Sequence, residues 1–369
     1  MSFYLYIVGA AVVALISVLA MGLFGGGNHM PVDGKVSSSP MQSNCRVLKH
    51  VLTYSCLLLQ TILVTGATEG MGRCAVRQLA AKGANIIVVS RNVARLEETV
   101  AEIKSAAKNP QTQRFHYISA DVSKPDYARS LVAEAVAWNN GQPLDIVWCI
   151  AGKSSPDFWF EAPLSLSRQQ MDINYWGSAE MAHALLREWC APDAPVVPEP
   201  KHLVFTASVL AFFPVIGYGP YSPPKAALRA LADTLNQELE AYPQNVKVHI
   251  VFPGGIQSPG FDRENQTKPE ITKVIEADDP VQSPEEVASR AIQGLENGDY
   301  MVTVGLLGRF FQWSALGGSP RNSWIVDTVV GGIAQVIWMY VVPDIFGKIR
   351  KFMKQHGHPG GYRNKANGV

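Results

Sequence analysis

The chain has 369 residues, of which 47% are hydrophobic and 17% charged, and its formal net charge is +1. This length allows a well-buried core, and the near-neutral charge argues against a nucleic-acid partner. The five cysteines form no C-x-x-C pair and no even framework, and no H-E-x-x-H motif is present. These absences argue against a disulfide scaffold, a zinc ribbon and any metal site, and they indicate a reducing compartment.

An uncharged apolar run occupies residues 4–24 near the start of the chain. Its 21 residues match the roughly 20 that cross a bilayer as a helix. The run exceeds the usual apolar region of a cleaved signal peptide, and no Lys or Arg precedes it. We therefore expect a membrane anchor over residues 1–24.

Residues 25–60 are expected to form a linker, and residues 36–60 within it fit neither the anchor nor a strand. Lys49 and His50 interrupt the apolar part of residues 36–60. This pattern argues against a second membrane crossing and against an amphipathic helix. Their 25 codons preserve the reading frame and are compatible with intron-like donor, branch-point and pyrimidine-rich sequences. We hypothesise a retained intron or minor-isoform insert, poorly ordered and dispensable. The alternative is a flexible spacer, and sequencing the transcript distinguishes the two.

Short β-rich runs then alternate with stretches of helical periodicity. Buried parallel strands are near-continuous apolar runs, and alternation with helices predicts a sheet covered on both faces. The predicted fold is α/β, a doubly wound parallel sheet of the Rossmann type over residues 61–300. The proline-rich stretch 190–202 is expected to be a surface loop. The strand-like runs are 61–66, 85–91, 115–122, 144–152, 202–208 and 247–255.

The first strand leads into "TGATEGMG", with Gly66, Gly70 and Gly72. Glycines at such a turn let backbone N–H groups approach a pyrophosphate at the start of the following helix. The second strand ends in "SRN", where Arg91 stands in place of the acidic residue that would bind a ribose 2′-hydroxyl. An arginine there would pair with a 2′-phosphate, so we expect NADPH as cofactor. An exposed Arg91 without this role is the alternative.

A second motif, "YGPYSPPKAAL", places Tyr221 four residues before Lys225, and Ser208 ends the preceding strand. Residues i and i+4 share a helix face, so the phenol and the ammonium can point into one cleft. A neighbouring ammonium is expected to lower the phenol pKa and so suit Tyr221 to general acid–base catalysis. Pro223 and Pro224 are tolerated if they lie in the first helical turn.

Together these motifs resemble the short-chain dehydrogenase/reductase family over roughly residues 61–260. The resemblance implies that Ser208 polarises a carbonyl, Tyr221 supplies a proton, Lys225 holds the nicotinamide ribose and tunes Tyr221, and Asn174 supports a water relay. Cys149 departs from the pattern, because the family has asparagine there. The residues that it places on the cofactor are Gly66, Thr68, Glu69, Gly70, Met71, Gly72, Arg91, Asp121, Val122, Ala151, Gly152, Tyr221, Lys225, Pro253, Gly254 and Ile256.

A narrower resemblance concerns Glu69 in the "TEGMG" variant, the stretch 258–273 and the anchor. It is to a branch of the family that reduces a long-chain 3-ketone in sphingolipid synthesis, at the endoplasmic reticulum membrane with the catalytic domain facing the cytosol. It implies a lipid ketone substrate and membrane lipid as partners, and leaves a homo-oligomer open. Glu69 is either an ordinary loop carboxylate or a ligand of a substrate ammonium. Several aromatic residues either line the route of the lipid tail or belong to the core: Phe158, Trp159, Phe160, Phe212, Phe213 and Phe261.

Two other functions stay open at this point. A membrane-bound reductase acting on a steroid, a retinoid or another lipid ketone would use the same catalytic groups with a different pocket. A non-enzymatic NADPH-binding scaffold would usually lose the tyrosine or the lysine, whereas Tyr221 and Lys225 are both present.

The C-terminal part is again apolar, over residues 324–347, and a cluster of Lys and Arg follows it. Asp327, Pro343 and Asp344 weaken a clean crossing of the bilayer, and basic flanks favour the cytoplasmic side. We expect residues 301–354 to form a membrane-associated segment that dips into or lies on the membrane and returns to the same side. A hydrophobic helix packed on the protein or on a partner is the alternative. A disordered tail is expected over 355–369.

Overall fold

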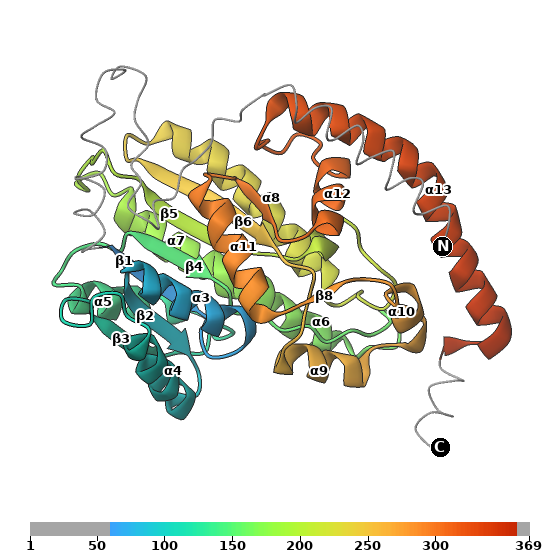
Figure 1. Ribbon diagram of the computed structural model, residues 1–369, viewed down its shortest axis with the longest axis horizontal. Helices are drawn as coiled ribbons and strands as arrows, with labels where there is room; N and C mark the ends of the chain where they lie inside the picture. The colour runs from blue at the N-terminus through green and yellow to red at the C-terminus, as the bar shows by residue number, and fades with distance from the viewer. Residues whose placement is uncertain (1–59, 360–369) are drawn as a thin grey trace.

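The computed structural model describes residues 60–359. The expected anchor (1–24), nearly all of the linker and insert (25–60), and residues 360–369 therefore lie outside the described part. Within it, seven parallel strands form one sheet in the order β3-β2-β1-β4-β5-β6-β9, which confirms the doubly wound prediction (Figure 1). The strands are β1 (Thr61–Thr65), β2 (Asn85–Ser90), β3 (Phe115–Ser119), β4 (Ile146–Cys149), β5 (Lys201–Thr206), β6 (Val246–Phe252) and β9 (Met301–Thr303).

The side chains of the central strands are buried on both faces of the sheet. All five residues of β1 are buried, and β1 pairs with β2 on one side and β4 on the other, so that Leu63 lies between Ile87 and Val147. Such strands need apolar side chains at every position rather than at alternate ones. The run "TILVT" therefore folds as a central strand, and the glycine-rich loop follows at its carboxyl end.

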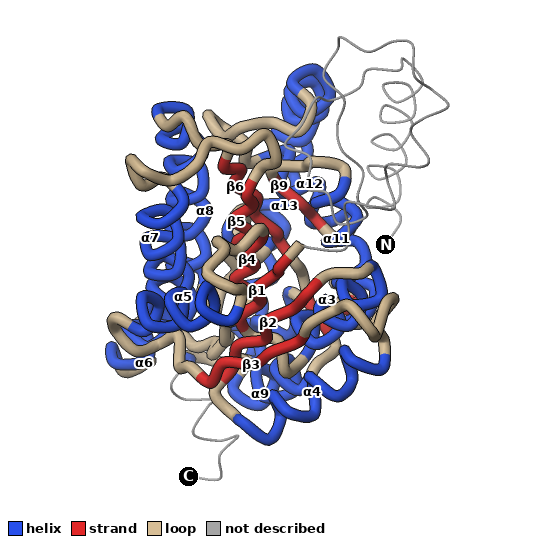
Figure 2. The backbone as a smooth tube through the Cα atoms, turned by 90° about the vertical axis from the view of Figure 1, so that its left-hand side faces the viewer, coloured by secondary structure: helices blue, strands red, loops and turns tan. Residues whose placement is uncertain are grey.

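Helices cover both faces of the sheet, which Figure 2 shows between two layers of helices. One layer consists of α3 (Gly70–Lys82), α4 (Val93–Ser105) and α11 (Pro284–Glu296). The other consists of α5 (Tyr127–Trp138), α7 (Gly177–Trp189) and α8 (Ser222–Glu238). Shorter elements complete the sheet layers and their connections: α6 (Leu164–Met171), η2 (Asp172–Trp176), η3 (Val209–Ala211), η4 (Leu239–Ala241), β7 (Gly255–Ile256), α9 (Pro259–Thr267), α10 (Glu270–Ile275), β8 (Val281–Gln282) and α12 (Leu306–Ser314). The described part ends with a long helix, α13 (Trp324–His356).

The sheet extends past the boundary expected at residue 300. Met301 pairs with Ile250 and Thr303 with Phe252, so β9 is the seventh strand and belongs to the nucleotide-binding domain. The expectation that the membrane-associated segment begins at residue 301 is therefore wrong at this end. The three-residue strand was missed because its apolar side chains are too few to form a recognisable run.

The C-terminal apolar segment forms one continuous helix, α13, which is long and apolar enough to cross a membrane by length and composition. It runs along the outside of the molecule with no break at which the chain turns back (Figure 1). One side of α13 packs on the protein through Trp338, whose ring centroid lies 4.6 Å from that of Phe213 and 5.8 Å from that of Phe311. The exposed apolar side chains are Trp324, Ile325, Val329, Ile333, Val336, Met339, Tyr340 and Phe346.

Asp327 is buried on the protein side of α13, where it accepts a hydrogen bond from Trp313 Nε1 at 2.9 Å. The charge that weakened a membrane reading of this segment thus faces the protein. The same side encloses an apolar pocket of about 190 Å³ between α13, Ile275 of α10 and the loop 213–216. The length of α13 and its exposed apolar side chains suggest that this helix associates with a membrane.

Candidate active site

The glycine-rich loop after β1 has a backbone that only glycine accommodates. Gly66 (φ +70°) and Gly70 (φ +51°) lie in the left-handed region, and a Cβ on Gly66 would lie 2.7 Å from the backbone of Ala151. A Cβ on Gly72 would lie 2.2 Å from the carbonyl oxygen of Gly66. Glu69, the N-cap residue of α3, makes no side-chain cap, so the first N–H groups of this helix keep the capacity to bind an anion. The loop fits the pyrophosphate of a dinucleotide.

Glu69 pairs with two arginines from separate helices. Its carboxylate contacts Arg95 of α4 and lies 2.7 Å from Arg263 of α9. Two cations thus surround it, and this carboxylate has no free negative charge to offer a substrate ammonium. The structure therefore supports the loop-carboxylate reading of Glu69, with the added feature that the carboxylate joins α9 to the glycine-rich loop.

The end of β2 lies beside this loop. The hydroxyls of Thr68 and Ser90 are 2.9 Å apart, and Arg91 follows with an exposed side chain. Burial pushes the pKa of Asp121 upward, but hydrogen bonds from Ser123 and the charge of Arg91 outweigh it and hold the pKa below its ordinary value. Arg91 and an ionised Asp121 therefore border the loop that would hold the adenosine half of a dinucleotide.

Ser208, Tyr221 and Lys225 come together at the carboxyl end of β5. The helix α8 begins at Ser222, so both prolines lie in its first turn as expected, and Tyr221 occupies the N-cap position. Ser208 is hydrogen-bonded to Tyr221, and Lys225 Nζ lies 5.7 Å from the centroid of the Tyr221 ring. The ammonium donates a hydrogen bond to the carbonyl oxygen of Thr206 at 3.0 Å. A phenol, a hydroxyl and an ammonium thus share one buried site.

The expectation that Lys225 lowers the pKa of Tyr221 is wrong for this structure. Burial raises the pKa of Tyr221, the charge of Glu264 raises it further, and the hydrogen bond from Ser208 opposes the rise only in part. Burial also lowers the pKa of Lys225 to about 8. Both shifts have one cause, because a water-poor site disfavours the charged form of each group. Tyr221 is therefore protonated at neutral pH and can act as a proton donor.

The shifted Lys225 predicts a pH dependence of stability. Between pH 8 and about 10 the unfolded chain, with a lysine pKa of about 10.4, holds a proton on this side chain that the folded chain has lost. Raising the pH through this window therefore removes a destabilising contribution of Lys225, worth up to about 1.4 kcal/mol per pH unit. Other groups, such as the Cys149 thiol, titrate in the wild-type protein and in Lys225→Met alike, so urea unfolding should show this slope in the difference between the two stabilities. Parallel curves would contradict the assignment.

Asn174 lies in the π-helical turn η2, a geometry found often at functional sites. Its Nδ2 donates to the carbonyl oxygens of Lys153 and Gln170, at 2.9 and 3.0 Å, and its Oδ1 accepts from Lys153 N. A Cβ on Gly152 would lie 2.9 Å from Asn174 Oδ1 and 3.3 Å from Lys225 Nζ. Gly152, Asn174 and Lys225 therefore border the same space.

Cys149, which stands where the family has asparagine, is fully buried in the core at the end of β4. Burial raises the pKa of its thiol to about 12, although a hydrogen bond with Ser178 opposes the rise. The side chain is thus a neutral core group. Among the described cysteines none is in a disulfide, and no group of three or more His, Cys, Asp or Glu in residues 60–359 could hold a metal ion.

The segment after β6 closes the site. The carbonyl oxygen of Pro253 accepts a hydrogen bond from Val209 N at 3.0 Å, next to Ser208. A Cβ on Gly254 would meet nothing within 4 Å, and one on Gly70 would lie 3.3 Å from Ser258. Residues 253–258 therefore run from Ser208 to the glycine-rich loop, as expected of a segment that borders a nicotinamide.

A group of residues near Tyr221 was missed by sequence reasoning. Tyr218 OH donates a hydrogen bond to Glu264 at 2.6 Å, and Lys268 lies 3.0 Å from Glu264 and 2.7 Å from Glu276. The stretch 258–273 contains Glu264 and Lys268, but it was read only as a family signature. Their chemical relation to Tyr218 depends on tertiary contact over 46 residues or more, which no local pattern reveals.

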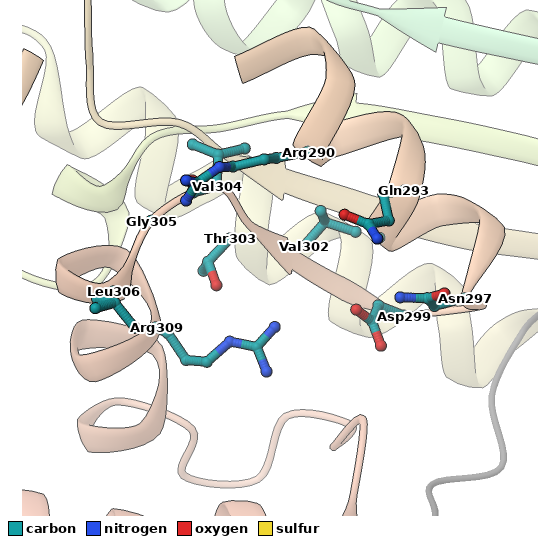
Figure 3. A pocket seen from close by; sticks show the side chains of 11 residues that line it. Arg290, Gln293, Asn297, Asp299, Val302, Thr303, Val304, Gly305, Leu306 and Arg309 are labelled. Carbon is teal, nitrogen blue, oxygen red and sulfur yellow. The ribbon is translucent and has the colours of Figure 1, made fainter. Parts of the chain in front are cut away.

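The six aromatic residues considered for a lipid tail differ in burial. Phe158 is buried, whereas Trp159 and Phe160 are 56% and 71% exposed. The other three, Phe212, Phe213 and Phe261, are half-buried. A pocket of about 410 Å³ lies elsewhere, between α11, β9 and α12 (Figure 3). It contains none of the predicted site residues, and Arg290 and Arg309 are among its lining side chains. The predicted site is better located by its chemistry than by the size of a cavity.

Comparison with known proteins places these observations in context. The family model for short chain dehydrogenases matches residues 60–269. A 3-ketodihydrosphingosine reductase from Neurospora crassa is 53% identical over 355 residues, which cover 95% of this chain and 91% of that relative. A second 3-ketodihydrosphingosine reductase, from Aspergillus fumigatus, is 46% identical over 348 residues, which cover 90% and 88%. A solved short-chain dehydrogenase from Sphingobium yanoikuyae in complex with NADPH shares the fold, with a TM-score of 0.57 at 20% identity over 70% of this chain and 93% of that one.

Proposed function

The chain belongs to the short chain dehydrogenase family, and from this membership we propose that it reduces 3-ketodihydrosphingosine to dihydrosphingosine with NADPH. It is an oxidoreductase acting on a ketone or CH–OH group. The observation that carries the proposal is the meeting of Ser208, Tyr221 and Lys225 beside a glycine-rich loop, in a chain whose relatives with this substrate match nearly its whole length.

The residues divide the chemistry among them. NADPH, when bound, supplies the hydride that reaches the carbonyl carbon. Ser208 donates a hydrogen bond to the carbonyl oxygen and increases its polarisation. Tyr221, kept protonated by burial, gives its proton to the same oxygen, which completes the alcohol. Lys225, whose pKa of about 8 lies close to neutral pH, can pass a proton toward the phenolate that is left. Asn174 holds the backbone of Lys153 beside this site.

The preference for NADPH rests on Arg91, which is exposed at the end of β2 next to the glycine-rich loop. Replacing Arg91 with Ala should weaken NADPH binding about 10- to 100-fold, the value of one charge-assisted hydrogen bond, with little change for NADH. Fluorescence titration with both cofactors measures this difference. Arg129→Ala, which removes an exposed arginine from α5, is the matched control. Equal weakening of both cofactors in Arg91→Ala would show that this residue is structural.

Substrate identity is tested by turnover. Membranes that contain the protein should reduce 3-ketodihydrosphingosine much faster than steroid or retinal ketones. Faster reduction of a steroid or retinal ketone would instead assign the chain to another membrane branch of the family. No turnover of any ketone, with NADPH binding retained, would favour a scaffold.

The membrane setting completes the proposal. We place the protein at the endoplasmic reticulum membrane with its catalytic domain facing the cytosol, held by α13 and by the anchor expected in residues 1–24. The exposed apolar side of α13 supports membrane association. A substrate with one long alkyl tail would partition into the same membrane. Protease protection in microsomes tests the orientation, because a domain facing the cytosol is digested without detergent.

A further inference from the structure

A charged cluster next to the catalytic tyrosine has no part in the chemistry described above. We define it by three residues: Glu264, Lys268 and Glu276. Lys268 is only 4% exposed at its side chain and lies 3.0 Å from Glu264 and 2.7 Å from Glu276. Because Glu264 is on α9 and Glu276 follows α10, the lysine joins two helices that cover this end of the site (Figure 1).

The charges of this cluster do not balance. Glu264 and Glu276, whose side chains are only 14% and 18% exposed, both face the single Lys268. Two carboxylates therefore face one lysine. An excess of buried negative charge is unfavourable unless a cation compensates it. Arg263, the other nearby cation of α9, is already paired with Glu69. The cluster has the charge to accept one more cation.

Glu264 is the member of the cluster nearest to the chemistry. Its carboxylate accepts a hydrogen bond from Tyr218 OH at 2.6 Å, and the ring of Tyr218 lies 6.0 Å from that of Tyr221. Tyr221 N also donates to the carbonyl oxygen of Tyr218 at 3.0 Å, which fixes the two tyrosines relative to each other. The charge of Glu264 acts on Tyr221 directly, because it raises the pKa of the phenol.

The loop that carries Tyr218 is also held against α10. Thr272 Oγ1 donates to the carbonyl oxygen of Ile216 at 2.8 Å, and Gly217 adopts φ +88° with no room for a Cβ beside Thr272. Tyr218 is therefore held by α10 through its own loop and by α9 through Glu264, and it connects the Glu264 carboxylate to the backbone of Tyr221.

The proposed substrate carries a cation at the required position. In 3-ketodihydrosphingosine the amino group is on the carbon next to the ketone, so its ammonium lies close to any carbonyl that contacts Tyr221. We propose that Glu264 binds this ammonium and so determines specificity for a 2-amino ketone, with Tyr218 as a positioning residue. This inference rests on the proposed function, and it gives the stretch 258–273 a chemical role.

The inference is tested with two ketones of the same chain length. One is 3-ketodihydrosphingosine, and the other is 1-hydroxyoctadecan-3-one, which lacks only the amino group. In Glu264→Gln, kcat/KM for the amino ketone should fall about 10- to 100-fold, as for the loss of one charge-assisted hydrogen bond, while that for the deamino ketone changes less than about threefold. Glu264→Asp, which keeps the charge, should retain part of the preference. Glu270→Gln is the matched control, because Glu270 is an exposed carboxylate of α10 paired with Lys273.

The outcomes separate the inference from the function on which it rests. If the wild-type protein reduces neither ketone, the proposed function fails and the inference with it. If the wild type reduces both ketones equally well, or if Glu264→Gln keeps the wild-type preference, the inference alone is overturned. It is also overturned if Glu264→Gln loses both activities to the same extent, because the cluster then acts only to hold α9 and α10 together.

Discussion

Replacing Tyr221 with Phe should lower kcat about 10²- to 10⁴-fold, the usual contribution of a general acid–base group. The substitution removes only the phenol oxygen, so the packing of the ring beside Tyr218 is kept. The affinity for NADPH should survive, since no main-chain contact of the glycine-rich loop changes. Steady-state turnover of 3-ketodihydrosphingosine and a parallel titration of NADPH measure the two effects separately.

Tyr218→Phe provides the comparison for this experiment. It also removes one phenol oxygen from the same loop, but from a residue that contacts Glu264 rather than the reacting carbonyl. Its effect on the deamino ketone should be small. Retention of more than a tenth of the wild-type kcat by Tyr221→Phe would rule out this tyrosine as the proton donor.

The loss of Ser208 should have the second largest effect, with kcat about 10²- to 10³-fold lower in Ser208→Ala, as for removal of one oxyanion-type hydrogen-bond donor. Ser208 is buried, its Oγ accepts a hydrogen bond from Leu210 N at 3.2 Å, and it is hydrogen-bonded to Tyr221. The hydroxyl is thereby aimed by its neighbours before a substrate arrives.

Ser222→Ala is the matched control for this serine. Ser222 is also buried and adjoins Tyr221, but its Oγ has no hydrogen-bond partner in the described structure. Removing that hydroxyl should leave kcat within about twofold, because no polar contact is lost. Similar losses in Ser208→Ala and Ser222→Ala would show that the first variant acts through packing, and the role of Ser208 would have to be withdrawn.

Much of the fold could be predicted from local sequence patterns. The run of apolar residues in β1, the glycines that follow it and the prolines before Lys225 are each dictated by contacts within a few residues or by backbone conformation. The spacing of Tyr221 and Lys225 likewise required only the period of a helix. These features could be predicted because the residues that form each contact are also the residues that make up the sequence pattern.

The remaining features depend on contacts between distant segments. Glu264 and Tyr218 are 46 residues apart, and neither residue alone suggests the other. The phenol pKa was predicted in the wrong direction because the i+4 spacing reveals a nearby ammonium but not the loss of water around both groups. Asp327 was read as an obstacle to membrane association, although its partner Trp313 keeps it on the protein side of α13.

The way α13 is attached has a practical consequence for making a soluble version of this reductase. Cutting the chain before Trp324 would remove Asp327 from Trp313 and Trp338 from Phe213, and would uncover the aromatic residues of α12. Phe213 lies between Ser208 and Tyr221 in the chain, so the exposed surface would border the loop that connects these two residues. A truncated protein therefore loses packed contacts together with the exposed apolar side chains of α13. Polar substitutions at exposed positions such as Ile325, Val329 and Met339 would instead reduce the exposed apolar surface of α13. The side of the helix that packs on the protein would stay in place.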